Sequence, residues 1–257
     1  MSKSINGAVL DLVARGKLSA VSCAVNHPAC EREDLEALGR FAPVIDRGLH
    51  LVLTEEGRPW GAHGTGSLRQ GAGFCSFGAL LRRSWLRRLE RDDVKGEIAA
   101  QYERFEILAG RRPEFIDGHL HAHQFPVIRE ALLDFVCELP ALERPYVRNT
   151  WIATRKMMHA GASLPKSILI SRPGTVFRRK AMCRGLATNT GFAGIYHYSP
   201  GSDFTRLFGR FLASTQMPND MLVVHPGSES WRRQEYETLR EWQPAPLTPN
   251  RFIWNRT

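Results

Sequence analysis

Short apolar runs alternate with amphipathic stretches along the chain, and this alternation restricts the possible folds more than any other feature. Three runs have the length and the β-branched content of buried strands, namely residues 18–25, 46–54 and 221–225. Apolar residues at helical spacing occur between and before them, for example over residues 5–15 and 31–40. Because strands that alternate with helices usually pair in parallel, the sequence predicts an α/β fold with a parallel sheet.

The other segments follow the same plan, with two exceptions. Further elements are expected as two helices in residues 80–108, a strand at 113–116, a helix at 126–139, a brief strand at 146–148 and a helix at 230–242. Residues 57–78 are rich in glycine and predict a long loop, whereas residues 150–190 show no legible pattern. Since no repeat and no linker divides the chain, we expect a single domain over residues 1–257.

The composition is that of a globular protein without a membrane span. Hydrophobic residues make up 43% of the chain and charged residues 24%, and no apolar run approaches the roughly 20 residues that span a bilayer. The first residues have no apolar signal-peptide core. The five cysteines are scattered and form no CxxC pair, which argues against a disulfide framework. We therefore expect a cytoplasmic protein without an integral membrane segment.

The net charge of +9 is concentrated in two arginine-rich stretches, residues 82–91 and 172–184. Two interpretations of these stretches stay open, a solvated surface and a site for an anionic substrate. Nucleic-acid modules combine such charge with aromatic stacking motifs or a recognition helix. Neither accompanies these stretches, so we expect no nucleic-acid partner.

The segment DGHLHAH, residues 117–123, is the strongest candidate for chemistry. Its acidic residue and its histidines recur at every second position: Asp117, His119, His121 and His123. On an extended backbone, side chains at this spacing share one face. Imidazole is the commonest metal ligand among side chains, and buried polar groups must find partners. The segment therefore predicts a metal site in a hydrolytic enzyme, with a histidine-rich surface loop as the alternative.

Two further histidines lie in or directly after predicted strands. His50 interrupts the apolar run LHLVL, and His225 follows the run MLVV. Because catalytic groups gather at the carboxyl ends of parallel strands, both histidines could converge with His119 on one site. Taken alone, a histidine in such a run is more often a core residue than a ligand.

Three histidine-containing motifs follow one another along the chain: GLHLVLT at residues 48–54, DGHLHAHQFP at 117–126 and HPG at 225–227. In this combination the chain resembles the YdjC-like family of carbohydrate deacetylases over nearly its whole length. The resemblance implies a distorted (β/α) barrel of the polysaccharide-deacetylase type. It also implies a metal-dependent hydrolase that removes acetyl groups from N-acetylated sugars, with a small sugar or an oligosaccharide as substrate and a homodimer as a possible assembly.

The resemblance also assigns roles to three histidines. A divalent ion, magnesium or zinc, would be bound by His50 and His119. His225 would lie in the pocket as an acid or as a stabiliser of the transition state. The family supplies a third metal ligand from an Asp-Asp-Phe-Gly motif after its first strand.

Four neighbours of these histidines are expected in supporting roles. His121 and His123 would orient the metal ligands or contact the substrate, and Asp117 belongs to the same group. Arg148 follows the predicted strand at residues 146–148 and could hold an anionic or hydroxyl-rich part of the substrate. A surface salt bridge is the alternative for Arg148.

The chain departs from the family pattern at its beginning. Residues 2–7 match the helix that follows the Asp-Asp-Phe-Gly motif, and the first strand and both aspartates are absent. Two explanations stay open: a start site placed too late, or a catalytically impaired homologue that binds sugar or metal without turnover. We expect the first, and we expect little or no turnover from the chain as given.

Overall fold

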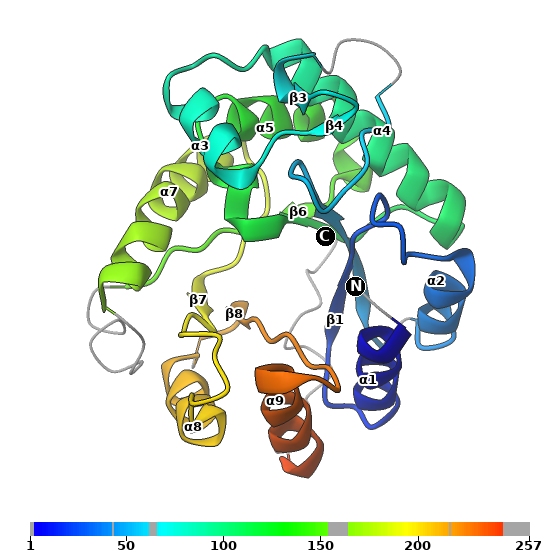
Figure 1. Cartoon of the computed structure of the whole chain (residues 1–257), viewed down its shortest axis with the longest axis vertical. Helices are drawn as coiled ribbons and strands as arrows, with labels where there is room; N and C mark the ends of the chain where they lie inside the picture. Colours follow the sequence, from blue (N-terminus) through cyan, green and yellow to red (C-terminus); the bar gives the residue numbers. More distant parts are fainter. Residues whose placement is uncertain (1–2, 43, 62–65, 154–163, 216, 244–257) are drawn as a thin grey trace.

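The computed structural model describes residues 3–42, 44–61, 66–153, 164–215 and 217–243. The strands β1 (Ala20–Cys23), β2 (Asp46–Leu51), β5 (Phe115–Gly118) and β6 (Tyr146–Val147) lie in the middle of the molecule, and the longer helices lie around them (Figure 1). None of the helices in these described ranges combines the length and the apolar character that crossing a bilayer requires.

A parallel sheet occupies the centre, with the order β1-β2-β5-β6 among the described strands. Each strand pairs in parallel with its neighbour in this order. A second parallel pair consists of β7 (Gly191–Ala193) and β8 (Asp220–Leu222). An isolated bridge between Val147 and Thr188 connects β6 to the segment before β7. The predicted α/β architecture with a parallel sheet is confirmed.

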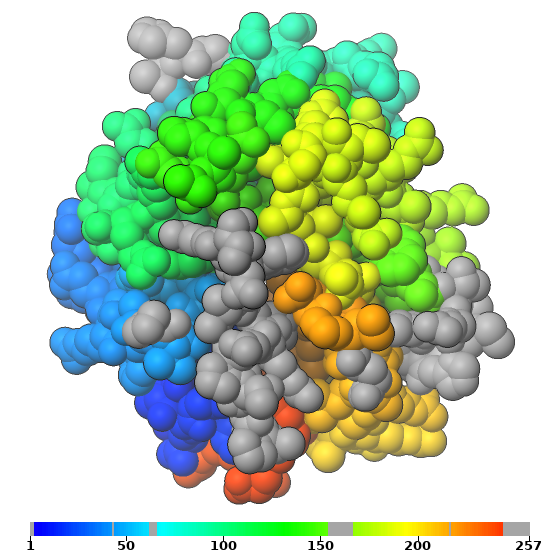
Figure 2. All heavy atoms as spheres, turned by 180° about the vertical axis from the view of Figure 1, so that it is seen from behind, coloured from blue at the N-terminus to red at the C-terminus, as the bar shows by residue number. Residues whose placement is uncertain are grey.

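Helices from both halves of the chain surround these strands. They are α1 (Lys3–Ala14), α2 (Arg32–Gly39), α3 (Phe77–Trp85), α4 (Arg91–Ala109), α5 (Ile128–Glu138), α7 (Leu164–Cys183), α8 (Phe204–Ser214) and α9 (Ser230–Glu241). Short elements complete the described chain: the 3-10 turns η1 (Gly66–Leu68), η2 (His119–Gln124) and η3 (Ala141–Glu143), and the antiparallel pair β3 (Arg69–Gln70) and β4 (Gly73–Phe74). The helices α1 and α9 lie side by side (Figures 1 and 2), and the Tyr236 hydroxyl donates a hydrogen bond to Asp11 at 2.9 Å.

The main hydrophobic core joins the central sheet to α4 and α5. Leu49 of β2 and Ile116 of β5 are fully buried in one cluster with Ile98 of α4 and Leu132 of α5. Burying each such side chain stabilises the fold by about 1.5–3 kcal/mol. Gly48 allows β2 and β5 to pack closely, because a Cβ atom at this position would lie 2.3 Å from the Phe115 ring. This packing brings the ends of the two strands together.

Three segments differ from their predicted structure. Residues 57–78 are not only a loop, because η1, β3 and β4 lie within them. The predicted strand at residues 221–225 is shorter and ends at Leu222. The illegible region includes α7, a helix of 20 residues with Pro173 in its interior, which obscures the helical pattern; residues 154–163 of that region lie outside the described residues.

Candidate metal and catalytic site

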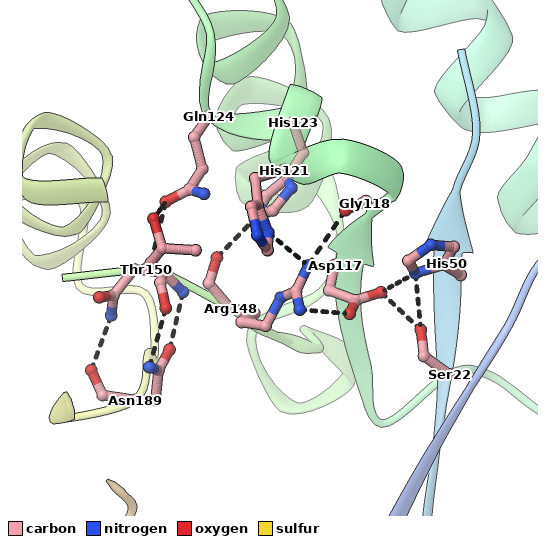
Figure 3. Close-up of polar contacts among 11 residues, drawn as sticks. Ser22, His50, Asp117, Gly118, His121, His123, Gln124, Arg148, Thr150 and Asn189 are labelled. Carbon is pink, nitrogen blue, oxygen red and sulfur yellow. Dashed lines mark hydrogen bonds and ion pairs between the residues drawn. The ribbon is translucent and has the colours of Figure 1, made fainter. Parts of the chain in front are cut away.

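Asp117 and His50 lie next to each other in the register of β5 and β2, where both strands end. The Asp117 carboxylate accepts a hydrogen bond from His50 Nδ1 at 2.7 Å and one from the Ser22 hydroxyl of β1 at 2.5 Å (Figure 3). With Nδ1 engaged, Nε2 is the nitrogen of His50 that remains for a metal ion. Metal-binding histidines are commonly held by a carboxylate in this way.

Arg148, the residue after β6, holds the other side of the Asp117 carboxylate. Its Nη1 atom lies 3.2 Å from Asp117 Oδ2, and its Nη2 atom donates to the Gly118 carbonyl at 3.0 Å (Figure 3). Burial alone would raise the pKa of Asp117, but Arg148, His50 and Ser22 together hold that pKa well below its usual range. Asp117 is therefore a permanent carboxylate at neutral pH.

The structure places Arg148 inside the protein. The side chain is 3% exposed, and besides Asp117 it contacts His121, with Nη2 lying 3.3 Å from His121 Nδ1. A surface salt bridge is thus excluded for this residue. The Arg148 guanidinium contacts the Asp117 carboxylate, the Gly118 carbonyl and the His121 ring. It therefore holds these groups in place and is not a free cation for the substrate.

The expectation that the alternating histidines share one face is wrong, because the backbone after Gly118 is not extended. Residues His119–Gln124 form η2, and inside it Leu120 and His121 have left-handed φ values of 50° and 59°. Such a conformation costs roughly 1–2 kcal/mol for each non-glycine residue, which the surrounding contacts must offset. The chain turns sharply at the end of β5, so the side chains of the three histidines lie in different environments.

His119 is the histidine of η2 that lies beside His50. Their ring centroids are 5.6 Å apart with the ring planes at 78°. His119 Nε2 is 3.6 Å from the Glu56 carboxylate. Burial, with the neighbouring His50, lowers the pKa of His119, and Glu56 partly opposes this change. The structure therefore brings together the two residues that the sequence predicted as metal ligands.

His121 and His123 lie further inside. The His121 and Phe192 rings meet edge to face at a centroid distance of 5.7 Å. His123 is fully buried, and its Nε2 donates to the Arg148 carbonyl at 2.8 Å. Burial lowers the pKa of His123 to about 3 and that of His121 well below its ordinary value. Both imidazoles are neutral at pH 7, and His123 connects η2 to the segment after β6.

The chemical groups at this site are of the types that bind a divalent metal ion. His50 and His119 supply imidazole nitrogen, and Asp117 supplies the carboxylate behind His50. Within the described ranges there is no group of three or more histidine, cysteine, aspartate or glutamate side chains that could hold a metal ion together. The described residues therefore supply two ligands of a metal site, the imidazoles of His50 and His119.

His225 lies three residues beyond β8. Its ring contacts Tyr198 at a centroid distance of 5.2 Å and Trp231 at 6.0 Å, both edge to face. Burial, followed by the charges of Arg232 and Arg148, lowers the pKa of His225 to about 3. The imidazole is neutral at physiological pH, and its Nδ1 atom is buried without a hydrogen-bond partner among the described residues.

Several residues that contact the predicted histidines were not themselves predicted from the sequence: Ser22, Glu56, Tyr198, and Glu235, whose carboxylate accepts the backbone N–H of His225. Ser22 had a weak signal, since it is a polar residue within the apolar run of β1. Glu235 had a clearer one, because it shares a helical face with Trp231 and Leu239 and a charged residue on such a face must find partners.

Curated relatives of this chain include proteins named chitooligosaccharide deacetylase. Those of Escherichia fergusonii and of Salmonella dublin and Salmonella enteritidis are 31%, 28% and 28% identical to it over 142 residues. Each alignment covers 54% of this chain and 52% of the relative, so the chain spans about half the length of the curated relatives it matches. The family model of the YdjC-like proteins matches residues 1–246. The chain therefore belongs to the YdjC-like protein family.

Proposed function

We propose that this protein removes acetyl groups from N-acetylated sugars, with a divalent metal ion bound by His50 and His119 in a deacetylase-type (β/α) barrel. The observation that carries the proposal is the Asp117–His50 contact of 2.7 Å with the His119 ring 5.6 Å from that of His50. The names of the curated relatives support the same reaction and the same class of substrate.

The bound ion would polarise the acetamide carbonyl and lower the pKa of a water molecule. The protein prepares the binding nitrogen: the Asp117 carboxylate accepts a hydrogen bond from Nδ1–H of His50 and thereby directs Nε2 away from the carboxylate. Arg148 keeps Asp117 ionised and fixed between β2 and β6. His50 is in this way held in one tautomer before any ligand arrives.

We assign His225 the role of transition-state stabiliser rather than that of a cationic acid. Its pKa of about 3 means that the ring carries no charge at neutral pH. A neutral imidazole still donates one N–H hydrogen bond, which can stabilise negative charge on a carbonyl oxygen. Since Nδ1 has no hydrogen-bond partner among the residues that the structure describes, it leaves hydrogen-bonding capacity for a substrate.

A second candidate function is binding of sugar or metal without turnover. It is favoured by the metal-ligand count, since the described residues supply two imidazoles and no third metal-binding group. The third ligand from an Asp-Asp-Phe-Gly segment, implied by the family resemblance, stays a prediction. So do the homodimer and the cytoplasmic location.

Metal content and acetate release separate the two candidates. We expect zinc or magnesium binding that His119→Ala abolishes, together with acetate release from N-acetylglucosamine oligomers by a version of the chain extended upstream through Asp-Asp-Phe-Gly. Metal analysis and an enzymatic acetate assay measure both properties. Stoichiometric metal without acetate in the extended version would support the second candidate, and unchanged metal in His119→Ala would refute the ligand assignment.

A further inference from the structure

Glu235 of α9 is a buried carboxylate for which the proposed reaction has no use. Its side chain is 0% exposed. One carboxylate oxygen accepts the Tyr196 hydroxyl, and the other accepts the backbone N–H of His225. Burial raises the pKa of Glu235 to about 7. Burying a carboxylate costs desolvation free energy unless hydrogen-bond partners compensate for it. The burial of Glu235 therefore needs a structural explanation.

The position of His225 in the chain supplies that reason. The last described hydrogen bond between this segment and β7 is the one from Val223 N to the Ala193 carbonyl at 3.1 Å. Two residues later, the sheet no longer holds the backbone. There the N–H of His225 donates to Glu235, and its carbonyl accepts Nη1 of Arg232 at 3.1 Å. Both polar backbone groups of His225 are thus held by side chains of α9.

The imidazole ring of His225 has few other constraints. It meets Tyr198 and Trp231 edge to face, and its Nδ1 atom has no hydrogen-bond partner in the described part of the chain. Aromatic contacts limit the tilt of the ring but define no hydrogen-bond direction. The direction of the ring N–H therefore depends on where the backbone of His225 is held.

We propose that Glu235 is a positioning residue, which fixes the backbone of His225 so that its imidazole faces the reacting carbonyl group. The inference rests on the proposed function, in which His225 stabilises the transition state. It requires an acceptor oxygen at the correct distance from the His225 N–H, and it does not require a negative charge. The Tyr196 hydroxyl can donate or accept, so it tolerates either protonation state of residue 235.

This requirement separates two conservative variants. Glu235→Gln keeps the side-chain length and one acceptor oxygen, while Glu235→Asp keeps the charge but withdraws its oxygens by about 1.5 Å, one carbon–carbon bond. In the version extended upstream through Asp-Asp-Phe-Gly, we expect Glu235→Gln to retain the kcat of the unsubstituted protein. We expect Glu235→Asp to lower kcat about 10- to 100-fold, as misplacement of a catalytic group by about 1 Å does. KM and bound metal should stay at wild-type values in both.

The matched controls are Glu237→Gln and Glu237→Asp, at an exposed position of the same helix. Both should behave as wild type, and circular dichroism should show folded protein throughout. A wild-type kcat in Glu235→Asp overturns the proposal. So does an equal loss in both Glu235 variants, because Glu235→Gln keeps an acceptor oxygen at the same distance and should lose no activity.

A measurement that does not depend on turnover tests this inference separately from the proposed function. In protein labelled with ¹⁵N-histidine, the His225 amide, identified by its absence in His225→Asn, should resonate downfield and exchange slowly. Both properties should persist in Glu235→Gln and be lost in Glu235→Asp. If the version extended upstream through Asp-Asp-Phe-Gly releases no acetate, the proposed function fails, while these amide signals still decide whether Glu235 holds His225.

Discussion

At the scale of single residues, the Asp117 carboxylate organises the site, because the groups of Ser22, His50 and Arg148 all converge on it. Removing its charge leaves a buried guanidinium without its counter-ion. Such broken pairs cost about 3–5 kcal/mol, and loss of the carboxylate behind a metal-bound histidine typically lowers metal affinity 10- to 100-fold.

We therefore predict that Asp117→Asn lowers the free energy of unfolding by about 3–5 kcal/mol and weakens metal binding. Urea denaturation and metal titration measure the two effects. Asp92→Asn, on the exposed first turn of α4, is the control and should change the free energy of unfolding by less than about 1 kcal/mol. Equal stability of the two variants would contradict the central role of Asp117.

The buried histidine His123 predicts a pH dependence of stability. Burial lowers its pKa in the folded state to about 3, whereas the value in an unfolded chain is about 6.5. The unfolded state therefore binds a proton first, and the free energy of unfolding falls as the pH drops from about 6.5 to about 3. One such group contributes a slope of up to about 1.4 kcal/mol per pH unit.

His123→Gln tests this contribution, since glutamine does not titrate. Denaturation curves at several pH values between 4 and 7 should show a shallower loss of stability in the variant than in the wild type. An identical slope in both proteins would show that His123 does not remain neutral in the folded state.

The sequence predicted which residues form the site better than it predicted the orientation of their side chains. The motifs named His50, His119 and His225, and the structure places the first two beside each other. The alternation of Asp117, His119, His121 and His123 suggested one shared face, but left-handed backbone at residues 120 and 121 reverses the chain at that point. This conformation results from tertiary contacts, so no local pattern in the sequence indicates it.

At the scale of elements, apolar runs predicted the central strands, because burial on both faces leaves a continuous hydrophobic signal. The same signal overestimated β8, whose run MLVV continues past the last ladder residue, Leu222. The helix α7 could not be predicted, since Pro173 lies inside it and its apolar residues show little helical periodicity.

The junction of β5 and η2 offers a test at this scale. A Cβ atom on Gly118 would lie 2.7 Å from His123 Nδ1, so the ring would have to move and weaken its bond to the Arg148 carbonyl. We predict that Gly118→Ala lowers the free energy of unfolding by about 1–3 kcal/mol. Gly78→Ala in α3 is the control, because nothing lies within 4 Å of a Cβ there.

Chemical denaturation compares these two alanine variants. Gly78→Ala should be neutral or stabilising by up to about 1 kcal/mol, as expected for alanine in a helix. A Gly118→Ala protein as stable as the wild type would show that β5 and η2 do not need this close approach.

At the scale of the whole molecule, a bound metal ion should stabilise the fold by mass action. At a free metal concentration of 100 times Kd, the gain is about 2.7 kcal/mol. We predict that zinc or magnesium raises Tm, that a chelator reverses the rise, and that His50→Ala removes it. His197→Ala, at an exposed position, should respond as the wild type does.

Thermal unfolding with and without metal measures this effect. A Tm that does not respond to either ion would contradict the metal site. A rise of equal size in His50→Ala would instead indicate that the ion binds elsewhere.

The convergence on Asp117 also has a consequence for folding kinetics. Ser22 and His50 reach it from strands 95 and 67 residues away along the chain, and Arg148 from a further strand. Contacts of such sequence separation form late, because long loops must close before the pairing is rewarded. Competence to bind metal should therefore return in the slowest refolding phase, together with the completed sheet, and no early intermediate should possess it.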